Sequence, residues 1–249
     1  MPNRRRTPLE IEEIKADSCS RDLRLSILHN LPFFRELSHG DVFDINKLFN
    51  DVHYPADHAI YYAGDKANRF CVIASGSVKL MKNSAEGHAA LIDILRQGEF
   101  FGSLESFGDT VHQETAIAQT PVCILKINSE NFRGILNRYP ACALKVLDIV
   151  AKRLSDAQEM IRQLSASSIE SRIVYTLLKL SGKLGEQKEV GLLIQIPLSR
   201  NDIAEMTGTT PETASRIMSQ LQREGIIKTG RKWIAIKDVR KLKQLCLPE

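Results

Sequence analysis

One stretch of this chain, Leu198 to Glu224, constrains its fold more than any other, because it contains two successive helix starts separated by a glycine. Ser199 can cap the first helix, and Asp202, three residues later, completes a variant of the capping box. Thr210 can cap the second helix, and Pro211 suits its first position because no amide partner is needed there. The pattern predicts a helix-turn-helix.

The second predicted helix has two distinct faces. Its apolar residues recur at helical spacing and indicate the face that packs on a core: Ala214, Ile217, Met218 and Leu221. Another face carries Glu212, Ser215 and Arg216, again at i, i+3, i+4 spacing. An ordinary helical hairpin with a solvated charged face has the same local pattern. The flanking sequence is therefore needed to distinguish it from a DNA-binding helix-turn-helix.

The sequence directly behind this helix predicts a β-hairpin. Ile226–Lys228 and Trp233–Ile236 are short β-like runs around a turn at Gly230. A hairpin in this place is a wing, and its basic residues would contact phosphates. From Arg200 to Lys243 there are ten Lys or Arg and five Asp or Glu, a net +5, whereas the whole chain carries +4. The positive charge is therefore concentrated on the predicted helix-turn-helix and its wing, as expected for a protein that binds nucleic acid.

We expect Glu212, Ser215 and Arg216 to contact bases in the major groove. An arginine can pair bidentately with guanine, a carboxylate can accept from the cytosine amino group, and a serine hydroxyl can contact the adjoining thymine or a phosphate. The residues expected to contact the DNA backbone are Ser199, Arg200, Thr210, Thr213, Lys228, Arg231 and Lys232.

The rest of the chain divides into three regions ahead of this domain. Residues 1–22 are expected to be a flexible tail, 23–130 a β-roll sensor domain, 131–166 a dimerisation helix, and 167–249 the winged helix-turn-helix domain. Short runs rich in β-branched and aromatic residues, punctuated by glycines, predict an antiparallel barrel or jelly roll. These runs are Ile60–Tyr62, Phe70–Ile73, Ser77–Met81, Ala89–Leu95 and Val122–Ile127. The expected fold class is therefore α+β.

Two seven-residue series of apolar residues run along the predicted dimerisation helix. They are Leu147, Val150, Leu154, Ala157, Ile161 and Leu164. Because the repeat is strict and its flanks are polar, it favours a parallel helix pair in a homodimer over one amphipathic helix packed on its own domain.

The composition favours a cytoplasmic protein. No apolar run is long enough for a membrane span, and the N-terminal sequence lacks an apolar signal segment. The five cysteines include no C-x-x-C pair, which argues against a disulfide scaffold. His53, His58, His88 and His112 do not assemble into a metal triad at the customary spacing, so no metal site is expected.

In domain order and in several motifs the chain resembles the Crp/Fnr superfamily of bacterial transcription regulators. The motifs are AGD at 63–65, SGSVKL at 75–80, GEFFGSL at 98–104 and TPETASRIMSQLQREGII at 210–227. The resemblance implies a cyclic-nucleotide-binding-like double-stranded β-helix, with double-stranded DNA as partner and RNA polymerase as a further partner of an activator. Glu212, Ser215 and Arg216 match the Fnr branch, since the cyclic-AMP receptor branch has glycine in place of Ser215. This match implies TTGA-type half-sites in a two-fold symmetric operator.

The sensor residues match none of the family's known effectors. Ser103 stands where a ribose-binding glutamate is needed, and the phosphate-binding arginine position falls on Gln113 or Glu114, which disfavours a cyclic nucleotide. An iron–sulfur cluster needs four ligands, and Cys19 and Cys123 supply only two. Haem is disfavoured because Gly102 and Ser103 follow the GEFF turn in place of an axial ligand. The candidate effector pocket comprises Gly98, Glu99, Ser103, Glu114 and Thr115.

Cys123 is interpreted first as a small buried hydrophobe in an apolar strand, with a redox pair between Cys19 and Cys123 as the other hypothesis. The leading function is thus a dimeric, sequence-specific transcription regulator that is not an enzyme. The alternatives are an effector-independent or redox-controlled regulator and, in another class, a cupin-like β-barrel metalloenzyme.

Overall fold

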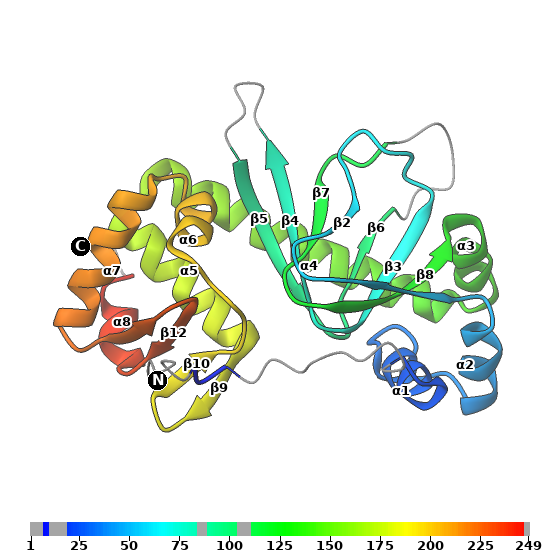
Figure 1. Cartoon of the computed structure of the whole chain (residues 1–249). Helices are drawn as coiled ribbons and strands as arrows, with labels where there is room; N and C mark the ends of the chain where they lie inside the picture. Colours follow the sequence, from blue (N-terminus) through cyan, green and yellow to red (C-terminus); the bar gives the residue numbers. More distant parts are fainter. Residues whose placement is uncertain (1–6, 10–18, 84–88, 104–110, 247–249) are drawn as a thin grey trace. The chain divides into compact units, whose positions relative to one another are not determined.

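The structure is a computed structural model that describes residues 7–9, 19–83, 89–103 and 111–246. These residues form two compact units, bounded in the sequence as Glu12–Asp156 and as Met1–Ile11 together with Ala157–Glu249 (Figure 1). Each unit combines helices with antiparallel strands, so the predicted α+β class is confirmed. Among the described residues, no helix combines the length and the apolar character that a bilayer span requires.

The unit of residues 12–156 begins with two short helices, continues through eight strands and ends in helices. Its elements are α1 (Arg21–Asn30), α2 (His39–Asn46), β1 (Asn50–Tyr54), β2 (Ala59–Tyr61), β3 (Arg69–Ser75), β4 (Ser77–Asn83), β5 (Ala89–Arg96), β6 (Phe100–Gly102), β7 (Thr115–Ala118), β8 (Val122–Asn128), α3 (Ser129–Arg138) and the greater part of α4 (Pro140–Ala166).

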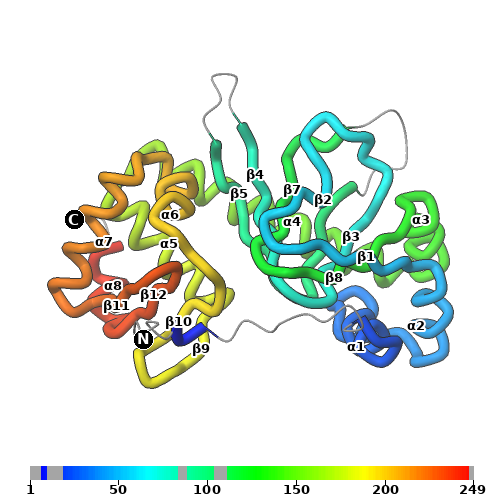
Figure 2. The backbone as a smooth tube through the Cα atoms, viewed as in Figure 1, coloured from blue at the N-terminus to red at the C-terminus, as the bar shows by residue number. Residues whose placement is uncertain are grey.

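The eight strands make two four-stranded sheets, in the orders β1-β8-β3-β6 and β2-β7-β4-β5, in which all neighbours are antiparallel. Most consecutive strands lie in different sheets, and strands far apart in sequence, such as β1 and β8, pair within one sheet, as in the predicted jelly roll. Figure 2 shows the path of the chain through this roll, with α1, α2 and α3 gathered at one side of it.

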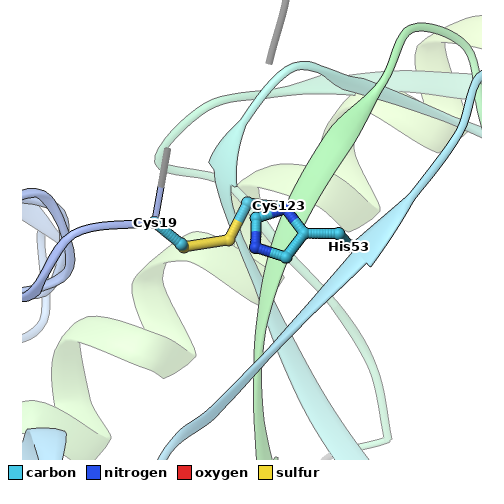
Figure 3. A group of neighbouring side chains, drawn as sticks. All are labelled: Cys19, His53 and Cys123. Atoms are coloured by element: carbon cyan, nitrogen blue, oxygen red, sulfur yellow. A yellow bond between two sulfur atoms is a disulfide. The ribbon is translucent and has the colours of Figure 1, made fainter. Parts of the chain in front are cut away.

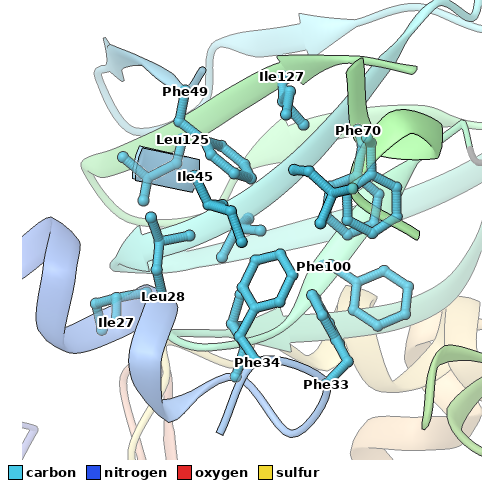
Figure 4. Close-up of a cluster of buried hydrophobic side chains, with 14 of the residues drawn as sticks. Ile27, Leu28, Phe33, Phe34, Ile45, Phe49, Phe70, Phe100, Leu125 and Ile127 are labelled. Carbon is cyan, nitrogen blue, oxygen red and sulfur yellow. The ribbon is translucent and has the colours of Figure 1, made fainter. Parts of the chain in front are cut away.

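Two apolar clusters fill the roll. The larger one joins the helices to the first sheet, and its centre is a group of aromatic rings in which Phe70 stacks on Phe132 with centroids 3.9 Å apart. Phe33 meets Phe34, Phe70 and Phe100 edge to face (Figure 4). The smaller cluster lies between the sheets around Ile73, Val78 and Ile124. Aromatic contacts of this kind stabilise a core beyond the burial of their area.

All five predicted runs are strands in the structure, with ends that move by one or two residues. The expected list omitted β1, β6 and β7. β6 and β7 have only three and four residues and therefore show little alternation, whereas β2, which is as short, was recognised by its run of one β-branched and two aromatic residues.

The predicted helix over 131–166 is in fact two helices. Tyr139, which precedes Pro140, leaves the helical conformation with φ −125° and ψ 77° and closes α3, and α4 starts at the proline. The proline ring disfavours the α conformation in the residue before it, so the break has a local cause.

The second unit contains the end of α4 and the C-terminal domain. Its further elements are α5 (Ile169–Leu184), β9 (Gly185–Lys188), β10 (Gly191–Ile194), α6 (Arg200–Thr207), α7 (Pro211–Arg223), β11 (Ile227–Gly230), β12 (Trp233–Ile236) and α8 (Val239–Gln244). The strands form one antiparallel sheet in the order β11-β12-β10-β9.

Leu9 does not fit the predicted flexible tail. It is buried in an apolar cluster with Leu193 and Ala235, so residues 7–9 belong to the C-terminal unit. A single apolar residue inside a charged segment gives no sequence signal of such docking. The rest of the tail as far as residue 18 lies outside the described residues, and Cys19 and Ser20 lead directly into α1.

Candidate nucleic-acid interface

The first helix of the motif, α6, is fixed at both ends by local chemistry. Its N-cap Ser199 accepts from the amide of Asp202 at 3.1 Å, while Asp202 accepts from the amide of Ser199 at 2.7 Å. The predicted capping box is therefore confirmed. Gly208 closes the helix with φ 59°, a left-handed conformation that glycine adopts without steric cost.

The second helix, α7, starts as the sequence predicts. Thr210 Oγ1 accepts from the amide of Thr213 at 3.2 Å, and Pro211 occupies the first turn. The apolar stripe of this helix is fully turned to the core: Ala214, Ile217, Met218 and Leu221. The helix-turn-helix is thus built as predicted.

The face of α7 opposite to the core carries the three predicted base-reading residues. Glu212 and Arg216 are exposed, and Ser215 between them is half-buried. Among the described ion pairs, none joins Glu212 to Arg216, so both side chains are available to a ligand. A carboxylate, a hydroxyl and a guanidinium on one helix face are the groups that recognise base edges in the major groove.

Strands β11 and β12 pair as an antiparallel hairpin, with Gly230 opposite Trp233. This hairpin is the predicted wing. Lys228, Arg231 and Lys232 are all exposed on it, and Lys232 adopts a positive φ of 61° at the turn. Three cations on one exposed hairpin make a surface that favours phosphate groups.

Four of the predicted DNA-backbone contacts already have partners inside the protein. Thr210 is the N-cap of α7, and its hydroxyl also donates to Thr213 Oγ1 at 3.2 Å. Ser199 serves as the N-cap of α6. Arg200 is half-buried, and its Nη2 donates to Thr229 Oγ1 at 2.9 Å, while Thr229 donates to Gln222 Oε1 at 2.6 Å. Burial lowers the pKa of the Arg200 guanidinium. Arg200 therefore joins α6 to the wing and, through Thr229, to α7.

The apolar series of α4 is exposed in the single chain. Leu147 is 62% exposed, Leu154 60% and Ile161 63%, and Val150, Ala157 and Leu164 are exposed as well. Leu144, which the heptad count missed because it lies outside the two series, is 65% exposed. Exposed large apolar side chains in a continuous stripe mark an interaction surface.

The residues of the candidate effector pocket are engaged with the protein. Glu114 Oε1 accepts from the hydroxyl of Tyr61 at 2.9 Å, and Thr115 Oγ1 accepts from the amide of Ala63 at 3.1 Å. Burial and then the neighbouring Glu114 carboxylate raise the pKa of Tyr61. Ser103 is buried, and its carbonyl accepts from Ser129 Oγ at 3.2 Å.

The other two residues of that pocket shape the turn before β6. Gly98 adopts a φ of 80° and its amide donates to the carbonyl of Ile73 at 2.8 Å, while Glu99 Oε2 accepts from the amide of Arg96 at 2.9 Å. The last residue of the GEFFGSL motif, at position 104, and residues 105–110 after it lie outside the described residues.

Cys123 is buried, as the first interpretation holds, but it is not a simple core residue. It forms a disulfide with Cys19 across 104 residues of sequence. His53 lies beside this pair, with one ligand atom of each of the three residues within 4.8 Å of the others. Sequence reasoning considered the cysteine pair and His53 separately and missed their combination. His58 is outside this group and lies against the carbonyl of Ala56, and His88 lies outside the described residues.

Comparison with protein-family models identifies a known domain in each part of the chain. Residues 51–139 match the model of the cyclic nucleotide-binding domain, and residues 171–245 match that of the Crp-like helix-turn-helix domain.

Two relatives match this chain along most of their own length. The cyclic AMP receptor protein of Thermus thermophilus is 27% identical over 214 residues, which cover 86% of this chain and 96% of the relative. The cAMP-activated global transcriptional regulator CRP of Pasteurella multocida is 28% identical over 184 residues, which cover 74% and 88%.

Among solved structures, FixK2 from Bradyrhizobium japonicum matches with a TM-score of 0.72 at 23% identity, covering 81% of this chain and 98% of its own. A CooA mutant from Carboxydothermus hydrogenoformans matches with a TM-score of 0.70 at 22% identity, covering 82% and 90%. The two structural similarities establish the fold. The matches to the family models and to the relatives establish the family. The chain therefore belongs to the Crp/Fnr family of DNA-binding transcription regulators.

Proposed function

We propose that this regulator binds a two-fold symmetric operator with TTGA-type half-sites as a homodimer, and that Glu212, Ser215 and Arg216 of α7 read each half-site. The observation that carries the proposal is the position of these three groups on the face of α7 turned away from its buried stripe, with Glu212 and Arg216 exposed and Ser215 half-buried between them. A guanidinium selects guanine, and a carboxylate one turn away can accept from the cytosine amino group of the same base pair. TTGA supplies such a pair.

The stripe on α4 supports the homodimer. Its residues follow a heptad repeat and are exposed, and a parallel helix pair would bury them along one seam. A two-fold dimer places its two recognition helices about 34 Å apart, one turn of DNA. The operator is therefore expected to contain two half-sites with that spacing between their centres. RNA polymerase is the further partner if the protein activates transcription.

The wing and the termini of the two helices would supply phosphate contacts. The exposed Lys228, Arg231 and Lys232 are suited to this role by position and charge. Arg200 is held by Thr229, so its expected role is to orient the wing against α6, with a phosphate contact as a second function.

For the sensor domain we infer that a cyclic nucleotide is not the effector, although the two relatives named above are cyclic-AMP proteins. Glu114 brings a carboxylate near the expected phosphate position and is bonded to Tyr61. A carboxylate repels a phosphodiester and offers it no hydrogen-bond donor. Titration of the protein with cyclic AMP is expected to give no change in operator affinity.

The experiment that tests the DNA proposal is a fluorescence anisotropy titration of a labelled symmetric TTGA duplex at fixed salt. Wild type is expected to bind this duplex at least about a thousandfold more tightly than a scrambled duplex, the lower end of the usual ratio for specific recognition. Arg216→Ala should lose most of that ratio. The matched control is Arg240→Ala, which removes the same charge from exposed α8 and should keep it. Equal affinity of wild type for both duplexes would refute the proposed operator.

A further inference from the structure

Three side chains capable of binding a metal come together in the sensor unit. Cys19 lies just before α1, His53 is on β1 and Cys123 is on β8, and their ligand atoms lie within 4.8 Å of one another (Figure 3). In this structure the two sulfur atoms are joined as a disulfide, with the Cα atoms 6.4 Å apart. None of these three residues is among the proposed DNA contacts of α6, α7 and the wing.

The register of the sheet sets two of the three positions. β1 is the edge strand of its sheet and pairs with β8 so that His53 lies directly opposite Cys123. Side chains of directly opposed residues project from the same face, with Cβ atoms about 4.5–5.5 Å apart. The imidazole therefore stays beside the Cys123 sulfur whatever the oxidation state of that sulfur.

The third position is set by α1. Ser20, the residue after Cys19, caps this helix by accepting from the amide of Leu23. Arg24 of the same helix donates to Asp51 at 2.6 Å and to the carbonyl of Phe49 at 2.6 Å, and so ties α1 to the start of β1. These bonds hold Cys19 near Cys123 independently of the disulfide.

The surroundings of the cluster differ on its two sides. Cys123 is fully buried in the larger apolar cluster and Cys19 is half-buried against it, whereas the His53 side chain is 34% exposed. An apolar environment disfavours a free thiolate, so reduced cysteines here gain from a partner that carries positive charge. The exposed imidazole marks the side from which such a partner can enter.

We propose that the reduced chain binds one Zn²⁺ through Cys19, Cys123 and His53, and that the disulfide is the oxidised, metal-free form of the same site. Two thiolates and one imidazole are a donor set that suits Zn²⁺, and three protein ligands leave the fourth tetrahedral position for water or an external ligand. The site gives the sensor unit an input that is separate from the nucleotide position.

The redox step balances with a peroxide as the oxidant. The two zinc-bound thiolates give up two electrons and form the S–S bond, and Zn²⁺ leaves with its charge unchanged. Hydrogen peroxide takes the two electrons together with two protons and becomes two molecules of water. Reduction by an external dithiol reverses the step and restores the ligands.

Asp51 supports the histidine from outside the site. Its Oδ2 lies 3.8 Å from His53 Nε2, while its Oδ1 is bonded to Arg24. A carboxylate that accepts from the second nitrogen of a ligating imidazole orients the ring. Arg24 thereby links the position of the ring to the helix that carries Cys19.

The test uses the full chain, reduced without oxygen and freed of reductant and metal. Co²⁺ is added as a spectroscopic substitute, and Zn²⁺ is then used to displace it. We expect one Co²⁺ per chain, with thiolate-to-cobalt charge-transfer bands and the intense visible bands of a tetrahedral ion, and full displacement by Zn²⁺. After treatment with hydrogen peroxide the bands should vanish, and the titratable thiols of the unfolded chain should fall from five to three.

The Zn²⁺ affinity of substituted chains identifies the residues that bind the ion. Cys19→Ser and His53→Gln are expected to weaken Zn²⁺ binding by more than about a hundredfold, the upper end of the loss for an outer-shell partner. Cys19→Ser tests the thiolate pair without a change in the buried strand, where Cys123→Ser could impair folding. The matched controls are His58→Gln, a neighbouring exposed histidine, and Cys246→Ser, which removes a half-buried free thiol after α8. Both controls should bind as wild type does.

Three results would overturn the proposal. The first is a reduced wild type without a tetrahedral cobalt spectrum. The second is an unchanged affinity in Cys19→Ser or His53→Gln. The third is equal metal binding before and after the disulfide forms. The readout involves no DNA, so it is independent of whether the operator proposal holds.

Discussion

The guanidinium of Arg153 on α4 lies over the ring of Phe100 on β6, 4.2 Å from the ring centroid, and its Nη2 donates to the carbonyl of the same residue at 2.8 Å. Burial lowers the pKa of Arg153, while Glu99 and Asp93 favour its charged form. One side chain thus connects α4 to the strand that follows the Gly98 turn.

Arg153→Ala is therefore expected to lower the free energy of unfolding by about 1–3 kcal/mol, since it removes a charge-assisted hydrogen bond and a cation–π contact. Urea unfolding measures this. Lys152→Ala, at the exposed neighbouring position, should change stability by less than about 0.5 kcal/mol. Similar losses in the two variants would show that the contact with Phe100 contributes nothing specific.

The turn of the helix-turn-helix offers a second test. Gly208→Ala places a side chain at φ 59° and should destabilise the protein by about 1–2 kcal/mol. The control is Gly182→Ala in α5, where an added Cβ meets nothing within 4 Å. That change should stabilise the helix by about 0.5–1 kcal/mol. The same sign for both substitutions would contradict the assigned backbone conformations.

The α4 stripe is tested by Leu154→Glu. A buried unpaired carboxylate in a helix seam disfavours association, so we expect a monomer in sedimentation velocity at concentrations where the proposed wild-type dimer forms. Ser155→Glu adds the same charge at the next, exposed position and should remain dimeric. A dimer in both variants would place the interface elsewhere.

The contact between Asp41 and Tyr139 predicts a pH dependence. Hydrogen bonds from Ser38 and from Tyr139, whose hydroxyl lies 2.5 Å from Oδ1, hold the pKa of the Asp41 carboxyl below its ordinary value of 3.8. A depressed folded pKa contributes stability that is present above the unfolded pKa and is lost as the pH falls through the folded one.

Tyr139→Phe removes one of these donors. Its deficit in the free energy of unfolding should be largest near neutral pH and should shrink below pH 3.8. Urea titrations at several pH values measure the deficit, with Tyr62→Phe, an exposed tyrosine, as the control. A deficit of constant size at every pH would contradict the role given to Asp41.

The sequence was most informative where structure is local. Ser199, Asp202, Thr210 and Pro211 act within a few residues of themselves, so capping rules predict both helices of the motif. The strands of seven or eight residues in the roll were also predictable from their β-branched and aromatic runs. The break before Pro140 has a local cause as well, but the regular apolar pattern on both sides of the proline concealed it.

What the sequence did not predict depends on distant register. His53 meets Cys123 because β1 pairs with β8, some 70 residues apart in the chain, and Cys19 reaches both through the packing of α1. The sequence offered the pair of Cys19 and Cys123 as one hypothesis, which the disulfide matches, but the place of His53 beside that pair follows only from the pairing of the strands. The burial of Leu9 in the C-terminal unit is a further contact of this kind.

The most direct test of the operator proposal is the coupling between Arg216 and the guanine of the half-site. Affinities are measured for wild type and Arg216→Ala, each with the TTGA duplex and with a duplex in which that G·C pair is replaced by A·T in both half-sites. Wild type should lose about 1–3 kcal/mol of binding free energy per half-site on the base change, and Arg216→Ala should lose close to nothing. An equal loss in both proteins would mean that Arg216 does not read this base.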